Sequence, residues 1–312
     1  MARLAPKGYN GGAIQDEVLP GPEQRREAGT FLVKNPEANK KKSARRPPDD
    51  TAAMDLTPML DAWEYSESKN IRRIQGGDGR ELIQVRLPLG IEQYEINGRP
   101  DGKRPMHHRS WLQFYSRKAR AIATDLPADE HRSFLNERDF ARLHHEGLLF
   151  YYRYLLFFQM QEYRLCARDT HRNLKLLDFV SRYAKPELAE QLEQYRPYIL
   201  RMYVMAQALL QIQDDGNVRA ALRRLQDGNR KIDALESIPG NQIFEWEKAR
   251  ALASLQDLIG QLEAQMPATR REQLQKQLES AIREENYEQA ATIRDQIQNL
   301  NESRRQRKSK NL

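Results

Sequence analysis

Residues 271–300 read REQLQKQLESAIREENYEQAATIRDQIQNL, and this stretch decides the fold of the C-terminal region. Its apolar residues fall into two groups, Leu274, Leu278, Ala281 and Ile282 before the Glu-Glu-Asn sequence and Ala290, Ile293, Ile297 and Leu300 after it. Spacings of three and four place each group on one face of a helix. Because the connection between the groups is short, the sequence predicts two antiparallel helices.

Capping residues mark where these two helices begin. Thr269 and Glu272, three positions apart, form a capping-box pattern at the start of the first helix. Asn286 and Gln289 repeat that spacing. The second helix is therefore expected to begin at about Tyr287.

The second half of the stretch resembles the UVR motif, a helical hairpin of the excision-repair subunits UvrB and UvrC, of Clp-type unfoldases and of the McsA adaptor. The resemblance is carried by Asn286-Tyr287-Glu288, Ala290-Ala291, Ile293-Arg294-Asp295 and Ile297. The sequence departs from the commonest form at Tyr287, where Phe is usual, and at Glu285, where the repair subunits often carry Leu. The resemblance covers about a tenth of the chain.

This resemblance implies a hairpin that docks another protein or a second copy of itself, which would make a homodimer. The side chains expected at the contact are Leu278, Tyr287, Glu288, Ala290, Ala291, Ile293, Arg294, Asp295 and Ile297. Tyr287 is expected at the centre, with the apolar residues buried and the charged residues setting the register.

Composition narrows the class of protein. The chain has 312 residues, 30% of them charged, and its mean hydropathy of -0.85 favours elongated helices with flexible ends. The single cysteine, Cys166, excludes an intramolecular disulfide framework. Residues 1–30 lack the apolar core of a signal peptide, and the apolar stretch 148–160 is short and interrupted by Arg153. These features predict a cytoplasmic protein without a membrane contact.

Basic residues are concentrated at the two ends of the chain. Residues 1–53 contain ten Lys/Arg and seven Asp/Glu, and residues 303–312 contain five Lys/Arg and no acid, so 36 basic and 37 acidic residues lie between them. The clustered cations are Lys40, Lys41, Lys42, Arg45, Arg46, Arg304, Arg305, Arg307 and Lys308. One interpretation is non-specific, salt-sensitive contact with nucleic-acid phosphates, as in a DNA-repair or ribosome factor. The other is that both ends are disordered, solvated tails.

A period of two predicts a small antiparallel β meander within residues 54–110. Alternating residues occur at 71–73, 83–87 and 89–96, and glycine-rich turns separate them. The segment resembles bacterial proteins of unassigned activity that also end in a UVR motif. No activity follows from that likeness.

The loop after the meander combines glycines with cations. Arg99, Gly102, Lys103 and Arg104 are candidates for an anion-binding loop, because backbone amides in a glycine-rich turn can hold an anion. The loop lacks both the spacing and the Lys-Ser/Thr ending of a phosphate-binding P-loop. A structural turn is the simpler interpretation.

Residues 111–238 have helical periodicity interrupted by prolines. The turns at 161–162 and 214–217 resemble the corners of tetratricopeptide-like pairs, but they lie about 55 residues apart, well over the usual repeat length. We therefore expect an irregular stack of helical hairpins, a type of structure that commonly binds proteins. Residues 241–266 are expected to form one long linking helix. Its coiled-coil seam is predicted at Leu252, Leu255, Ile259, Leu262 and Met266.

Signals for catalysis or metal binding are weak. The pairs His107-His108 and His144-His145 cannot each make a metal site, because adjacent helical residues point about 100° apart. The sequence predicts no enzyme activity, no metal and no cofactor. It predicts a mainly α protein, with a helical-hairpin stack, a C-terminal antiparallel helical hairpin at 267–302 and a small antiparallel β meander near the N-terminus. The expected function is that of a non-enzymatic adaptor that docks a protein.

Overall fold

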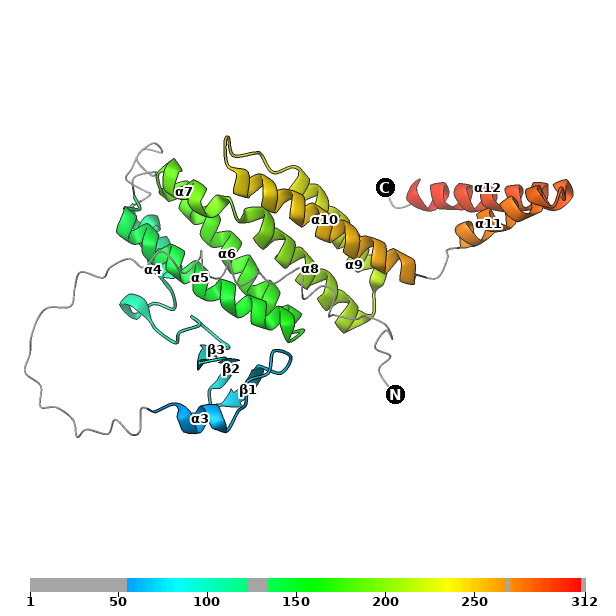
Figure 1. The fold of residues 1–312 in the computed structure, drawn as a ribbon. Coiled ribbons are helices and arrows are strands. Elements are labelled where there is room, and N and C mark those ends of the chain that lie inside the picture. The colour runs from blue at the N-terminus through cyan, green and yellow to red at the C-terminus, as the bar shows by residue number, and fades with distance from the viewer. Residues whose placement is uncertain (1–54, 123–133, 267–269, 310–312) are drawn as a thin grey trace, which may run out of the picture. The chain divides into compact units, whose positions relative to one another are not determined.

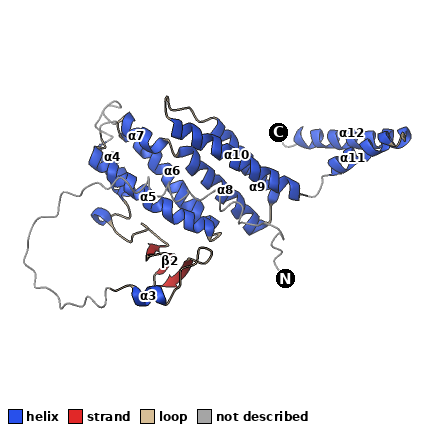
Figure 2. Cartoon of the chain, in the orientation of Figure 1, coloured by secondary structure: helices blue, strands red, loops and turns tan. Residues whose placement is uncertain are grey.

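The computed structural model describes residues 55–122, 134–266 and 270–309 (Figure 1). Contacts between Cα atoms divide the chain into two compact units, residues 1–256 and 257–312. The predicted fold class is confirmed: the chain is mainly helical, with one small antiparallel sheet near the N-terminus (Figure 2). The N-terminal tail predicted at residues 1–53 and the cap predicted at Thr269 lie outside the described residues.

The sheet follows a short helix, α3 (Thr57–Asp61). Its strands are β1 (Ile71–Gln75), β2 (Glu81–Leu87) and β3 (Gly90–Glu95), paired antiparallel in the order β1-β2-β3 as the alternation predicted. The register places Arg72 opposite Gln84 and Gln84 opposite Gln93. Hydrogen bonds join these three side chains across the sheet. The Arg72 guanidinium also lies 3.9 Å from the centre of the Trp63 ring, so Trp63 covers part of this face.

Helices make up most of the remaining described residues of the first unit. A 3-10 turn at Pro105–His107 leads to α4 (Trp111–Ile122), α5 (Glu137–Gln159), α6 (Tyr163–Tyr183), α7 (Pro186–Glu193), α8 (Arg196–Asp215), α9 (Val218–Asp233) and α10 (Gln242–Gln265), the last of which continues into the second unit. Helix α6 packs against both α5 and α8, and α8 packs against α9. Figure 1 shows these helices side by side. The observed arrangement is thus a stack of antiparallel neighbours.

Backbone geometry explains the two corners that the sequence predicted. After the end of α5, Gln161 lies in the left-handed region (φ 58°), and the Glu162 N–H donates to the Phe157 carbonyl at 2.8 Å. Helix α8 ends at Gly216 (φ 62°), and the Asn217 side chain then accepts from the backbone N–H of Ala220 at 3.0 Å to begin α9. Both predicted turns are confirmed.

Close packing brings α9 against α8 near Gly228. A β-carbon built at Gly228 would lie 2.4 Å from Cγ1 of Val204, which is too close for any side chain. Glycine at this position therefore lets the two helices approach each other. The hydroxyl of Ser254 on α10 accepts from the buried Arg201 guanidinium of α8 at 2.9 Å, so α10 is joined to the same stack.

Two features differ from the predictions. The fully buried row on α10 contains Ala251, Leu255, Leu258 and Leu262, whereas the predicted Leu252 is half-buried. The predicted seam contains only large apolar residues and so omits Ala251, whose small side chain suits a close contact between helices. The second difference is that residues 303–309 are helical rather than a disordered tail, since Arg, Gln and Lys are strong helix formers.

None of the helices within residues 55–122, 134–266 and 270–309 is both long enough and apolar enough to cross a bilayer.

Candidate functional site

The second unit contains the predicted hairpin, built from α11 (Arg270–Arg283) and α12 (Tyr287–Ser309). The turn between them is a Schellman motif, in which Glu285 occupies the left-handed region (φ 55°). The Asn286 N–H donates to the Ala281 carbonyl at 2.8 Å, and the Glu285 N–H donates to the Ile282 carbonyl at 3.1 Å. These bonds satisfy the last carbonyls of α11 and reverse the chain within three residues.

Asn286 then starts α12, as its spacing to Gln289 predicted. The Asn286 side-chain oxygen accepts from the Gln289 N–H at 3.2 Å, and the Asn286 amide nitrogen donates to the Gln289 side-chain oxygen at 3.0 Å. One residue therefore ends the turn and caps the next helix.

The facing sides of α11 and α12 form a small apolar core. Four side chains, Leu274, Ala281, Ala290 and Ile293, are between 2% and 5% exposed, and Leu278 and Ile297 pack against them half-buried. Ala281 and Ala290 lie at the turn end of the hairpin, and the larger residues Leu274 and Ile293 lie further from the turn. The apolar pattern of the motif thus holds the hairpin together.

Apolar side chains remain exposed at the turn end of the hairpin. Tyr287 is 68% exposed at the first residue of α12, and Ile282 is 47% exposed near the end of α11. We call these two residues the hairpin tip. Large exposed apolar side chains in this position are available to a partner.

The structure separates the predicted partner-contact residues into two groups. Ala290 and Ile293, with Leu278 and Ile297 in part, already contact the opposite helix of the hairpin. The remaining predicted residues, Tyr287, Glu288, Ala291, Arg294 and Asp295, are exposed. The apolar spacing places Ile282 on the inner stripe, but the structure leaves this side chain 47% exposed.

The candidate anion loop is held by the protein's own groups. Arg99 is 7% exposed, and its guanidinium pairs with Asp101 at 2.9 Å and lies 3.6 Å from the buried carboxylate of Glu146. Gly102 has a φ of 69°, and a β-carbon there would lie 3.1 Å from the Glu95 carboxylate. Lys103 and Arg104, by contrast, are exposed. The geometry of Arg99 is that of a residue that closes a turn.

Sequence reasoning missed a buried charge network behind this loop. The Arg153 guanidinium of α5 binds both oxygens of Asp169 on α6, at 2.7 and 3.0 Å, and donates to the carbonyls of Glu95 at 2.6 Å and Gly98 at 3.0 Å. Burial lowers the pKa of Arg153, and the Asp169 carboxylate opposes that shift. The network therefore fixes the end of β3 on the helices.

A second arginine, Arg172, belongs to the same buried network. It pairs with Glu146, whose carboxylate also accepts from the backbone N–H groups of Trp111 at 2.7 Å and Leu112 at 3.1 Å. Burial lowers the pKa of Arg172 to about 10, with Glu146 opposing. One feature of the sequence could have indicated this network. Asp169 and Arg172 both fall on the apolar stripe of α6, where charged residues need buried partners.

The predicted nucleic-acid contacts have no described geometry. Lys40, Lys41, Lys42, Arg45 and Arg46 lie outside the described residues, and the backbone of Arg304, Arg305, Arg307 and Lys308 is part of α12. Within residues 55–122, 134–266 and 270–309, no three or more His, Cys, Asp or Glu side chains gather as metal ligands would.

Comparison with known proteins identifies a family match in the hairpin. The family model described as the UvrB/uvrC motif, UVR, matches residues 269–303. Comparison with curated proteins and with solved structures found no match. The match coincides with α11, its Schellman turn and the part of α12 that faces α11. The chain therefore carries a UVR motif at residues 269–303.

Proposed function

We propose that this protein is a non-enzymatic adaptor that docks a protein partner through the tip of its UVR hairpin. The observation that carries the proposal is the exposure of Tyr287 and Ile282 on a hairpin whose other apolar side chains are largely buried in its own core. An exposed aromatic and an exposed aliphatic side chain close in sequence to charged residues are typical of a contact centre with a polar rim.

The charged rim gives the contact its orientation. Glu288, Arg294 and Asp295 are exposed along α12, and no ion pair joins any of them to another described residue. Charges of both signs along one helix select a partner with the opposite pattern and discriminate against like-charged surfaces. The expected contact is therefore apolar at the tip and electrostatic along α12.

The test is affinity capture from the protein's own cells with Tyr287→Asp and a matched control. Tyr287 is the first residue of α12, where a carboxylate is favourable to the helix dipole, so the substitution leaves the hairpin folded. Leu89→Asp alters a side chain that is 92% exposed at the β2–β3 turn of the other unit.

We expect a protein that wild type and Leu89→Asp capture equally and that Tyr287→Asp loses. Loss of a central aromatic contact typically costs about 2 kcal/mol, or roughly a thirtyfold weaker affinity. Equal capture by all three proteins would refute the docking role. Capture of only a second copy of this chain would replace the adaptor by a homodimer.

A further inference from the structure

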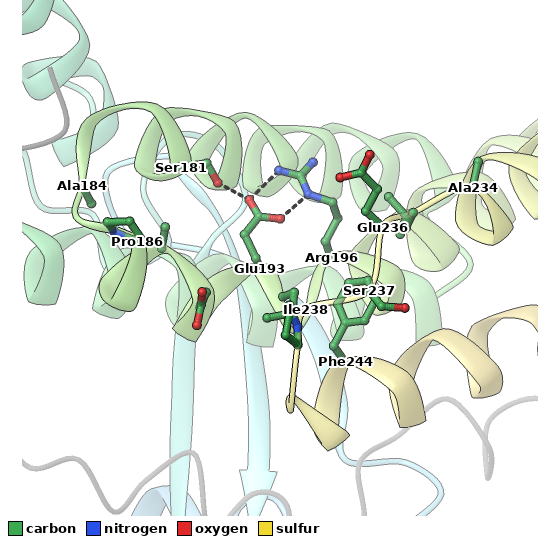
Figure 3. A pocket seen from close by; sticks show the side chains of 14 residues that line it. Ser181, Ala184, Pro186, Glu193, Arg196, Ala234, Glu236, Ser237, Ile238 and Phe244 are labelled. Atoms are coloured by element: carbon green, nitrogen blue, oxygen red, sulfur yellow. Dashed lines mark hydrogen bonds and ion pairs between the residues drawn. The ribbon is translucent and has the colours of Figure 1, made fainter. Parts of the chain in front are cut away.

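The first unit has a groove of about 780 Å³ where the end of α6, α7, the start of α8 and the α9–α10 connection meet (Figure 3). Its apolar lining comes from Ala184, Ala189, Ile238, Pro239 and Phe244. Phe244 is 2% exposed, so the groove has a packed apolar floor. An apolar floor of this kind accepts aliphatic or aromatic side chains.

Carboxylates outnumber cations in the lining of this groove. Glu190, Glu193 and Glu236 line it together with one cation, Arg196. Arg196 is already paired, because it donates to the Glu193 carboxylate and to Asp178 at 2.9 Å, as the dashed lines between Arg196 and Glu193 in Figure 3 indicate. Glu190 and Glu236 are exposed, and their carboxylates bind no other side chain among the described residues. The groove therefore attracts a positively charged ligand.

Two further cations, Lys185 and Lys248, lie near the groove without neutralising it. Lys185 is exposed between the lining residues Ala184 and Pro186, and the acidic Glu187 is exposed two positions further on. The Lys248 ammonium donates to the backbone carbonyl of Leu235 at 2.7 Å. It therefore stabilises the α9–α10 connection. The groove combines an apolar floor with two free carboxylates, and its ligand should carry apolar and basic side chains within one short segment.

The chain contains such a segment before its first described residue. Residues 31–46 read FLVKNPEANKKKSARR, with three consecutive apolar residues, six Lys/Arg and one Glu. Val33 precedes Asp55 by 22 positions, and an extended chain of that length reaches about 75 Å. A domain of about 200 residues has a radius of gyration of only about 16 Å. The tether is therefore long enough to reach any face of the first unit.

We propose that the groove binds this chain's own residues 31–46, with Phe31-Leu32-Val33 on the apolar floor and the basic cluster beside Glu190 and Glu236. Binding in cis is favoured over binding a free peptide, because the tether keeps the segment at a high effective concentration. The segment need not form a helix or strand in order to bind. This proposal does not depend on the docking role of the hairpin, so an experiment can refute either proposal and leave the other intact.

Disulfide trapping in the full-length protein tests this placement. Ser43→Cys is combined with Ser237→Cys, which lies in the groove lining, or with the control Ser68→Cys, which is exposed near β1. Ser68 is much closer to Ser43 along the chain, so a free tether forms the control disulfide faster. The native Cys166 does not compete, because it is fully buried.

The expected result is faster disulfide formation at Ser237 than at Ser68, within one chain and at low protein concentration. Glu190→Gln with Glu236→Gln should reduce the Ser237 rate to the level seen in about 0.5 M NaCl, where charge interactions are screened within a few ångströms. Faster formation at Ser68 would overturn the proposal. So would a Ser237 disulfide found only between two chains, or one unaffected by both the glutamine substitutions and salt.

Discussion

Asp169→Asn should destabilise the first unit far more than the loss of an exposed ion pair. The Asp169 and Arg153 side chains are each 1% exposed, and no second carboxylate among the described residues forms an ion pair with Arg153. Substitution keeps the size of the side chain and one acceptor oxygen but removes the negative charge, so the guanidinium stays buried without a counter-charge and with neutral acceptors such as the carbonyls of Glu95 and Gly98. Removing one partner of a buried ion pair costs about 3–5 kcal/mol.

Thermal and urea unfolding followed by circular dichroism measure this loss. For a unit of this size, each kcal/mol lost from the free energy of unfolding lowers the Tm by about 2–4 °C. A fall of roughly 6–20 °C in Tm is therefore expected. The matched control is Asp78→Asn, which alters an ion pair with Arg80 whose side chains are 52% and 58% exposed. That change should leave the Tm almost unchanged, because water and salt screen an exposed ion pair.

Equal losses for Asp169→Asn and Asp78→Asn would refute the idea that the buried network fixes β3 on the helices. A further variant, Arg153→Met with Asp169→Leu, removes both charges. It should recover much of the stability, because neither charge then remains buried without its partner.

Three further changes test other features. Gly228→Ala should destabilise by about 1–2 kcal/mol in urea unfolding because of its clash with Val204, whereas Gly260→Ala, with open space at its β-carbon, should stabilise by up to about 1 kcal/mol. Glu285→Gly should raise the Tm of the hairpin, since glycine adopts φ 55° without strain; no change would argue against the Schellman turn. Burial lowers the pKa of His144 below 6.5, so the unfolded chain binds the proton first and stability should fall as pH drops below about 6.5. His144→Gln should weaken that dependence.

The sequence alone predicted those features of the fold that depend on neighbouring residues. Alternation predicted an antiparallel meander of two or three strands, and the structure has three. The Asn286–Gln289 spacing predicted the start of α12, because a cap depends on a few neighbouring residues. The glycine at 216 likewise marked a helix end, since a left-handed backbone favours that residue.

Contacts between distant segments could not be predicted in this way. Arg153 meets Asp169 and the carbonyl of Gly98 only after α5, α6 and the sheet have come together. The exposure of Ile282 depends on how far α11 rotates before its turn, and a difference of one residue decides between the inner and the outer face. The contacts of Arg153 and the exposure of Ile282 are set by packing between elements, and the periodicity of the sequence does not predict them.

The most direct measurement places a photoreactive benzophenone amino acid at Tyr287 in the protein's own cells, with the same probe at Leu89 as the control. If the hairpin tip docks a partner, the probe at 287 forms one dominant adduct with another protein, and the probe at 89 does not. Adducts only within this chain, or the same adducts from both positions, would contradict the account.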